Sequence, residues 1–494
     1  MKTIQYIICI VVVLCSSCDD FLTVNPPHNQ TIDNAIKDYD GAKNVINGMY
    51  ATLSLGSGTS MSDFFGGAPF CALSAQAGIL KAGGTTYYSM TYDSETRYLG
   101  TFWSQWYACV NAANAAIISI SALDDKKFPS IEEKNRMLGE AKCFRAWVYS
   151  HLLWCYCHFW ADDEYGLLYR EELADMVNMI RPRISVRESY EKIFADLKDA
   201  IAYLGDYTKA TRLSKQMAQV LKAKLLLNRG WDGDYEEALG LIDEIIATAP
   251  AIFAMDSDME KMYKDAWDSH EVLWARYLED GEGRAYGEAT YSMVIITAGD
   301  KYVDDVTQPS SLKSFYAEFN NWIQGDPRYE TTMGWARHLR ATGVQYFCPT
   351  KLAREGRVDM NDKFTTYYFR YPELFLMQAE LRARTGETLA ESIAPINTMR
   401  AKRMNPVLPE LPTPSSQEEL MDIIFKEYCL ELYAENGSDW LASLRFKKNG
   451  QPWFKSMKSD TDMDIVTEDL WCWPIPSTET SVNKEIKPNP GYDN

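Results

Sequence analysis

The chain has 494 residues, of which 46% are hydrophobic and 24% are charged. This composition is typical of a folded protein with a sizeable core and excludes a disordered tail. The formal net charge of −19 repels phosphate backbones and anionic lipids alike, so we expect no nucleic-acid partner and no membrane attachment by charge.

The N-terminus has the pattern of a bacterial lipoprotein signal. Lys2 precedes an apolar run from Ile7 to Leu14, which is shorter than the roughly 20 residues that a membrane-spanning helix needs. Two serines then precede Cys18. The pattern predicts a signal peptide over residues 1–17 and acylation of Cys18, and more than one acyl chain suffices for stable anchoring. The alternative is an ordinary secretory signal with Cys18 near the cut by chance.

Helix signals dominate the rest of the chain. Ser185 and Glu188 have the spacing of a capping box, in which the Ser accepts from the backbone and the Glu reaches back to the cap. The apolar residues that follow are three or four positions apart as far as Leu204, which predicts one helical stripe. Similar helix starts occur at Ser130 with Glu133, Thr388 with Glu391, and Ser416 with Glu419.

Several predicted helices form pairs. A helix ending at Gly230, a short turn and a second helix beginning at Gly233 resemble a tetratricopeptide unit, and the small Ala238 permits close packing. Unrelated helical hairpins are the alternative. Three further pairs are predicted: residues 371–384 with 389–404, 131–160 with 185–204, and 37–54 with 100–122.

Two long regions lack the helical pattern. Residues 56–98 are rich in Gly, Ser and Thr, and residues 250–365 mix aromatic residues with short strand-like runs such as Met293–Thr297 and Val344–Phe347. Loops longer than about 15 residues are uncommon in compact domains unless they have a function. Long loops on a rigid helical scaffold favour a binding role.

Other groups of reactive residues favour packing over chemistry. The eight cysteines after Cys18 have no framework spacing, so we expect buried thiols rather than disulfides. His151, Cys155 and His158 share one predicted helix face with metal-ligand spacing, but neighbouring apolar residues favour a buried face without metal. No nucleotide-binding, hydrolase-elbow or zincin motif occurs.

Seven segments follow one another along the mature chain in a recognisable order: Cys18–Leu22 with Pro26, Asn47–Tyr50, Glu140–Tyr149, Tyr371–Arg384, Ile396–Arg400, Trp473–Glu479 and Asn489–Tyr492. Together they resemble the SusD/RagB family of outer-membrane nutrient-binding lipoproteins. One departure concerns Glu435–Trp440, where the family shows Glu-Gly-x-Arg; only Arg445 is similar to the family's second arginine, which puts an ionic contact of the family in doubt.

The resemblance implies an all-α, tetratricopeptide-like superhelical scaffold with long loop-rich insertions and minor β-strands. We divide the chain into residues 18–230 and 231–494, folded as one compact unit. Family members are non-catalytic: they capture oligosaccharides at the cell surface and cover a SusC-like TonB-dependent transporter as a lid. Asp19 and Asp20 are similar to the signal that sends such lipoproteins to the outer face.

Aromatic side chains in the two irregular regions are the candidate ligand contacts. Glycans present flat C–H faces flanked by hydroxyls, which aromatic rings and a few fixed polar groups recognise. Packing of the same rings onto the scaffold is the alternative, and we expect packing for Trp103, Trp106 and Tyr107. The candidates are Tyr87, Tyr88, Tyr92, Arg97 and Tyr98 in the first region, and Arg284, Tyr286, Tyr291 and Trp322 in the second.

The leading hypothesis is therefore a surface-tethered oligosaccharide-binding protein with no cofactor. A surface glycosidase with an unrecognised carboxylate pair is one alternative, because sequence does not show which carboxylates are close in space. A scaffold whose repeats bind only protein is another. The sequence leaves open which glycan binds, and whether calcium orders the loops.

Overall fold

The structure is a computed structural model, and the first 35 residues, including the predicted signal and Cys18, lie outside the described residues. The described residues are 36–54, 67–80, 85–175, 177–249, 253–264, 269–278, 326–332, 334–337, 345–348, 351, 364–458 and 462–492.

The described chain is mainly helical, as predicted. Residues 56–98, which were expected to lack helices, nevertheless contain two helices, Gly67–Gln76 and Thr85–Ser89. The longer helices are α3 (Tyr39–Ala51), α4 (Gly67–Gln76), α6 (Arg97–Ala122), α7 (Ile131–Tyr156), α8 (Val186–Tyr203), α9 (Lys215–Arg229), α10 (Asp234–Thr248), α16 (Pro372–Thr385), α17 (Leu389–Ala401), α18 (Gln417–Leu432) and α19 (Ser438–Arg445). The shorter helices are η1 (Thr52–Ser54), α5 (Thr85–Ser89), η2 (Asp125–Lys127), α11 (Met259–Lys264), α15 (Arg328–Thr332), α20 (Trp453–Met457), η6 (Glu468–Trp471) and α21 (Ser477–Thr480).

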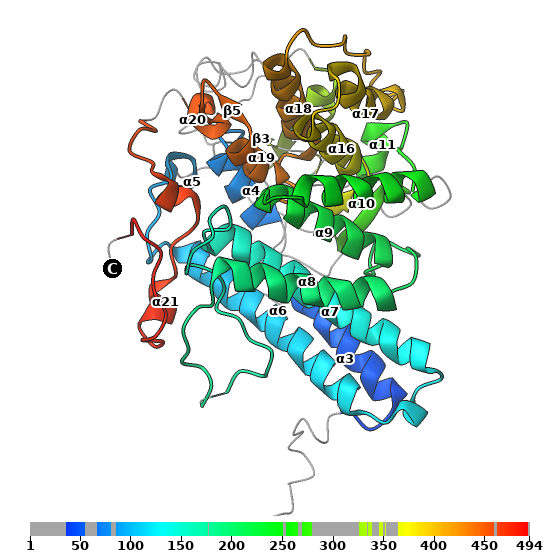
Figure 1. Cartoon of the computed structure of the whole chain (residues 1–494), viewed down its shortest axis with the longest axis vertical. Helices are drawn as coiled ribbons and strands as arrows, with labels where there is room; N and C mark the ends of the chain where they lie inside the picture. Colours follow the sequence, from blue (N-terminus) through cyan, green and yellow to red (C-terminus); the bar gives the residue numbers. More distant parts are fainter. Residues whose placement is uncertain are drawn as a thin grey trace, which may run out of the picture.

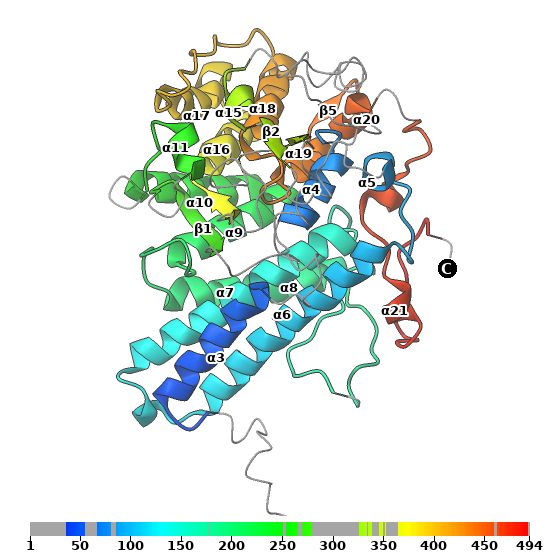
Figure 2. The same cartoon turned by 180° about the vertical axis from the view of Figure 1, so that it is seen from behind.

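All four predicted helix pairs are present. Helix α3 packs on α6, α7 on α8, α9 on α10, and α16 on α17, while α8–α9 and α10–α16 contacts join the pairs into one array. Figures 1 and 2 show this array rising from α3, α6 and α7 at one end to α16, α17 and α18 at the other. Gly230 ends α9 in the left-handed conformation with φ 63°, where a glycine avoids the steric cost of a side chain.

The predicted helix starts are confirmed, but the reciprocal bond of the capping box varies. The Ser or Thr side chain accepts from the third backbone N–H at Ser130, Ser185, Thr388 and Ser416. Both halves of the box form at Thr388, where Glu391 accepts from the cap N–H at 3.0 Å. Glu133 instead accepts from Arg136 and Tyr39. Tertiary and side-chain partners therefore compete for the glutamate.

Three small antiparallel sheets accompany the helices in the described part of the chain: β1 (Val272–Leu278) with β4 (Phe364–Arg370), β2 (Gly334–Arg337) with β3 (Gln345–Cys348), and β5 (Lys447–Lys448) with β6 (Gln451–Pro452). Strand β3 overlaps the predicted run at residues 344–347. The run at residues 293–297 lies outside the described residues.

One large apolar core runs through the helical array and contains residues from both predicted regions, while the division at residue 230 stays a prediction. His151, Cys155 and His158 are buried, as expected, but α7 ends at Tyr156, so His158 lies beyond the helix and does not share its face. Burial lowers the pKa of His151 to about 3, so its ring is neutral at physiological pH. Seven cysteines after Cys18 are buried thiols, while the Cys348 side chain lies outside the described residues.

A second, ionic core lies between α18, β1 and β4. We call it the ionic cluster and define it by the side chains of Glu271, Asp326, Arg328, Lys351, Arg370, Arg400, Arg403, Glu427, Glu431 and Glu435. Cations and carboxylates are present in equal number in this set. Each charge has partners of the opposite sign, which is what makes burial of charge tolerable.

The segment that departs from the family's sequence pattern takes part in this ionic core. Glu435 accepts from Arg370 Nε at 2.8 Å and from Lys351 Nζ at 2.6 Å. Arg445 forms a two-bond pair with Glu380, with distances of 3.0 and 2.9 Å. The ionic contacts of this segment are therefore present and structural, with Arg445 facing a glutamate from α16.

Among the described residues, no helix combines the length and the apolar character needed to cross a membrane.

Candidate functional site

Three of the predicted ligand-contacting tyrosines are in the interior. Tyr87 and Tyr88 are 6% exposed and Tyr92 is 4% exposed. The ring centroid of Tyr87 lies 6.4 Å from that of Trp473, and Tyr92 donates its hydroxyl to the Leu470 carbonyl at 2.9 Å. Burial also raises the pKa of the Tyr87 and Tyr92 hydroxyls. In this structure these rings dock helix α5 and its flanks onto the C-terminal segment, which is the packing alternative.

The structure says less about the other predicted ligand-contacting residues. Tyr98 is half-buried on the first turn of α6, and the backbone of Arg97 begins that helix. Arg284, Tyr286, Tyr291 and Trp322 lie outside the described residues. The role of these residues in ligand binding stays a prediction.

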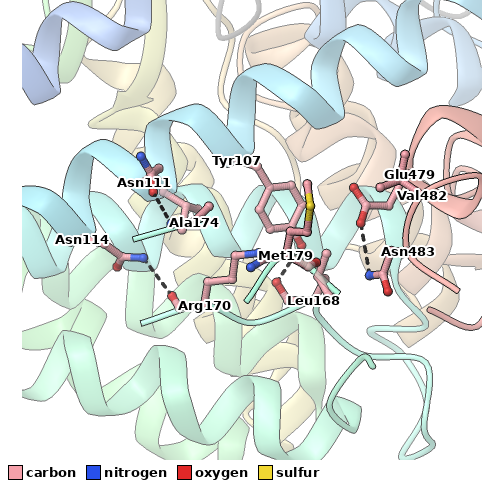
Figure 3. A pocket seen from close by; sticks show the side chains of 11 residues that line it. Tyr107, Asn111, Asn114, Leu168, Arg170, Ala174, Met179, Glu479, Val482 and Asn483 are labelled. Atoms are coloured by element: carbon pink, nitrogen blue, oxygen red, sulfur yellow. Dashed lines mark hydrogen bonds between the residues drawn. The ribbon is translucent and has the colours of Figure 1, made fainter. Parts of the chain in front are cut away.

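The described part of the chain contains a cavity of about 210 Å³ that the sequence analysis did not identify. Its walls come from helix α6, from the loop between α7 and α8, and from the C-terminal segment around α21 (Figure 3). Tyr107 projects from α6 into the cavity, between the two asparagines of α6 and the C-terminal wall (Figure 3). The Tyr107 hydroxyl donates to the Leu168 carbonyl at 3.0 Å. This bond holds the side chain in place, and its ring lines the cavity.

Helix α6 determines the course of the α7–α8 loop through two asparagines one turn apart. Asn114 is fully buried and donates to the carbonyls of Arg170 and Glu172 at 3.1 and 3.0 Å. Asn111 accepts from the Ala174 backbone at 2.9 Å. These bonds supply partners to backbone groups of the loop, whose described residues form no helix or strand.

The loop is closed on itself by Arg170, whose side chain also lines the cavity. The guanidinium donates to the carbonyl of Asn178 at 2.9 Å and to that of Met179 at 2.6 Å. Gly166 permits the two ends of the loop to meet, because a Cβ there would lie 2.4 Å from the Ser185 carbonyl oxygen. The loop geometry is therefore fixed by a few polar residues.

The C-terminal wall is joined to both other walls. Glu479 accepts from Trp103 of α6 and from Asn483, both at 3.2 Å. Asn483 also donates to the Arg181 carbonyl at 2.9 Å and accepts from the Arg181 N–H at 3.2 Å. Segments about 300 residues apart in the chain, 302 for the pair Arg181 and Asn483, thus form one site.

The rim of the cavity exposes apolar side chains. Met179 and Val482, which both line the cavity, are 40% and 52% exposed. Val177 and Ile180, near Met179 in the same loop, are 92% and 49% exposed. Exposed apolar residues gathered in one place are typical of a binding surface, whereas single ones need no explanation.

Tyr107 was predicted to pack onto the scaffold, but it is only partly buried. Trp103 and Trp106 are buried in the core, as predicted, while Tyr107 is half-buried at the cavity. The spacing of Tyr107, Asn111 and Asn114 places them on one face of α6. This polar face on an otherwise apolar helix is the sequence feature that could have indicated the cavity.

No metal site is evident in the described ranges: they hold no group of three or more His, Cys, Asp and Glu side chains placed to bind a metal ion. The cavity offers hydrogen bonds and apolar contact.

Family comparisons cover most of the chain. Residues 20–227 match a family described as "starch-binding associating with outer membrane", and residues 345–492 match the SusD family. Among curated proteins, the chain is 22% identical over 440 residues to SusD-like protein P2 of Formosa agariphila, covering 82% of this chain and 83% of that protein.

Solved structures agree in fold. A SusD-like carbohydrate binding protein from Bacteroides vulgatus has a TM-score of 0.67 at 17% identity, covering 91% of this chain and 98% of its own. A laminarin binding SusD-like protein has a TM-score of 0.66 at 19% identity, covering 92% and 100%. The chain belongs to the SusD/RagB family of non-catalytic carbohydrate-binding proteins associated with the outer membrane.

Proposed function

We propose that this protein is a lipid-anchored outer-membrane protein that captures oligosaccharides at the cell surface and passes them to a SusC-like TonB-dependent transporter. The observation that carries the proposal is the match of residues 20–227 to a starch-binding, outer-membrane-associated family, which begins two residues after the predicted lipidated Cys18. The match to the SusD family at residues 345–492 supports it independently.

The anchor supports the delivery role. Acyl chains on Cys18 keep the protein on the membrane that holds the transporter, so even a weak protein–protein contact operates at high effective concentration. The protein acts as a lid over the pore, facing the extracellular side. Asp19 and Asp20 after the acylated residue support that orientation.

The anchor is tested by Cys18→Ala with Cys15→Ala as the matched control, since both cysteines lie in the N-terminal segment. Membrane fractions of cells expressing each variant are probed for the protein and for incorporated fatty acid. We expect Cys18→Ala to abolish acylation and membrane retention, and Cys15→Ala to leave both unchanged. Retention of the Cys18→Ala protein at wild-type level refutes the anchor.

The transporter partnership is tested by affinity purification of the tagged protein from detergent-solubilised outer membrane. We expect a TonB-dependent transporter to co-purify in near-equal amount from wild-type cells. Its absence under mild detergent, with other outer-membrane proteins recovered intact, contradicts the delivery role.

The predicted loop face is tested by comparing two tyrosines. Tyr291→Ala removes a candidate stacking ring, and we expect it to weaken polysaccharide binding by about 1–3 kcal/mol, the range measured for a base stacked on an aromatic ring. Tyr88 is buried, so Tyr88→Ala lowers stability instead. Unchanged polysaccharide affinity of Tyr291→Ala removes that residue from the proposal.

A further inference from the structure

The cavity beside α6 contains a charged donor and a charged acceptor that do not pair with each other. Arg170 is 8% exposed and forms no ion pair within 4.0 Å among the described residues; its bonds go to carbonyls and an amide oxygen. Among the described residues, the Glu479 carboxylate accepts only from the neutral side-chain donors of Trp103 and Asn483. Figure 3 shows Arg170 and Glu479 in different walls, with Met179 between them.

Both groups keep hydrogen-bonding capacity. A guanidinium has five N–H donors, and the loop uses three bonds from Arg170, two at Nη1 and one at Nη2. Each carboxylate oxygen accepts about two bonds, and each oxygen of Glu479 receives one. Asn111 uses its amide oxygen for Ala174, which leaves its NH₂ group as a further donor.

The other walls are apolar. The Tyr107 ring, Leu168 and Val110 form the inner surface, and Met179 and Val482 form the rim. An aromatic ring with aliphatic neighbours suits a C–H-rich ligand face, while the donors and acceptor at its edges suit hydroxyl groups.

We infer that this cavity binds one neutral pyranose unit of a glycan, with its ring against Tyr107 and its hydroxyls between Arg170 and Glu479. The inference rests on the proposed function and adds to it a subsite and a ligand class. A hydroxyl both accepts from a guanidinium and donates to a carboxylate, which no purely anionic or cationic group does.

Size and charge favour this ligand class. The volume of about 210 Å³ lies below the roughly 300–1,000 Å³ of pockets for drug-sized ligands, which favours a single sugar ring over a longer oligosaccharide. The charges of Arg170 and Glu479 cancel, and the net charge of −19 disfavours an acidic sugar at long range.

Val482→Trp is the test variant, because Val482 lies on the rim and is 52% exposed, so the larger ring closes the cavity without entering the core. The matched control is Val407→Trp, at a 64% exposed position that does not line the cavity. Thermal unfolding of both variants verifies that they fold.

The probes are methyl β-D-glucopyranoside and methyl β-D-galactopyranoside, with glucuronic acid as the anionic arm. Saturation-transfer NMR is recorded on the full chain, and crystals soaked in each probe locate it. We expect transfer to at least one neutral pyranoside, density between Tyr107 and Arg170, and loss of both in Val482→Trp but not in Val407→Trp. No pyranoside in the cavity, an unaffected Val482→Trp signal, or binding of glucuronic acid alone overturns the inference.

Polysaccharide titration separates this inference from the proposed function. If the cavity is one of several subsites, Val482→Trp lowers polysaccharide affinity about tenfold because one contact of a multivalent chain is lost. Wild-type affinity in Val482→Trp, with an empty cavity in the soaked crystals, overturns the subsite and leaves the proposed function standing. A pyranoside in the cavity of a protein that binds no polysaccharide supports the subsite and contradicts capture of glycan chains.

Discussion

Arg370 and Arg170 are both buried arginines, but their partners differ. Arg370 in the ionic cluster contacts Glu271 at 2.6 Å, Glu435 at 2.8 Å and Glu431 at 3.0 Å. In the part of the chain that the structure describes, the Arg170 guanidinium at the cavity donates only to oxygen atoms of neutral groups in its loop. Three carboxylates neutralise the charge of the Arg370 guanidinium, so it attracts a ligand little. The charge of the Arg170 guanidinium is not neutralised by its neutral partners and can still attract a polar ligand. The first arrangement holds the fold together, and the second leaves hydrogen-bonding capacity at a cavity.

The largest effect is expected from breaking the ionic cluster at its most connected carboxylate. Glu431 lies within 2.9 Å of Arg403, 3.0 Å of Arg370 and 3.3 Å of Arg328. Burial alone would raise the pKa of Glu431, but these three guanidinium groups hold it below its ordinary value. Glu431→Gln keeps the shape and removes the charge, which leaves buried cations uncompensated.

We expect Glu431→Gln to lower the free energy of unfolding by about 3–5 kcal/mol, measured by denaturant titration. Lys487→Ala is the control, because Lys487 pairs with Glu164 on the surface, where ion pairs contribute little to stability. Equal effects of the two substitutions contradict a structural role for the cluster.

A pH-dependent effect is expected at Asp439, which is buried and accepts from Ser74 and from the Trp440 backbone. Burial raises the pKa of Asp439 to about 6, above the roughly 4 of the unfolded chain. The folded state therefore binds this proton more tightly, so its stabilising contribution is present below pH ~4 and is lost as the pH rises to about 6.

Asp439→Asn removes this titration. We expect the stability of the variant relative to wild type to increase by about 3 kcal/mol between pH 4 and pH 7, since each pKa unit corresponds to about 1.36 kcal/mol. Denaturant titrations of both proteins across this range measure the difference, in which the other titrating groups cancel. A flat difference would show that Asp439 titrates normally.

The cavity region is expected to respond more weakly than the ionic cluster. Asn114→Ala leaves the Glu172 carbonyl without this donor and leaves the Arg170 carbonyl with only the Tyr149 hydroxyl among the described donors. It also removes an acceptor 2.8 Å from Arg145 Nη1. We expect a loss of about 1–3 kcal/mol and faster backbone hydrogen exchange confined to the α7–α8 loop. Exchange that accelerates throughout α6 and α7 instead would mean that Asn114 supports the core rather than the loop.

The smallest loss of stability is expected from Arg170→Lys, and comparing it with Arg370→Lys tests the difference between the two arginines. Lysine cannot reproduce a two-carbonyl contact, so Arg170→Lys is expected to lose about 1 kcal/mol, whereas Arg370→Lys loses several ion pairs and about 3–5 kcal/mol. Thermal and denaturant unfolding compare the two variants. If both variants lose similar free energy of unfolding, Arg170 has a structural role like that of Arg370, and the distinction between them is wrong.

The sequence predicted the parts of the fold that depend on neighbouring residues. Helix starts at Ser130 and Thr388, the turn at Gly230 and the paired helices follow from patterns within a few dozen residues. The ionic cluster cannot be predicted from such local patterns, because Arg370 and Glu271 are 99 positions apart and Arg328 and Glu431 are 103 apart. Nothing local indicates which distant carboxylate a given arginine meets.

The candidate site was harder to predict for a related reason. A tyrosine in a region rich in Gly, Ser and Thr has the same local sequence whether it stacks on a ligand or packs, and Tyr87 and Tyr92 pack against the distant Trp473 and Tyr492. The cavity joins α6 to residues beyond 475, so its composition appears only in three dimensions.

Isothermal titration of the intact protein against a panel of purified polysaccharides tests the central claim, glycan capture, most directly. We expect saturable heat with at least one polysaccharide, no release of shorter products during the titration, and reduced affinity in Val482→Trp. Heat from no glycan in the panel together with saturable heat from a peptide would contradict glycan capture.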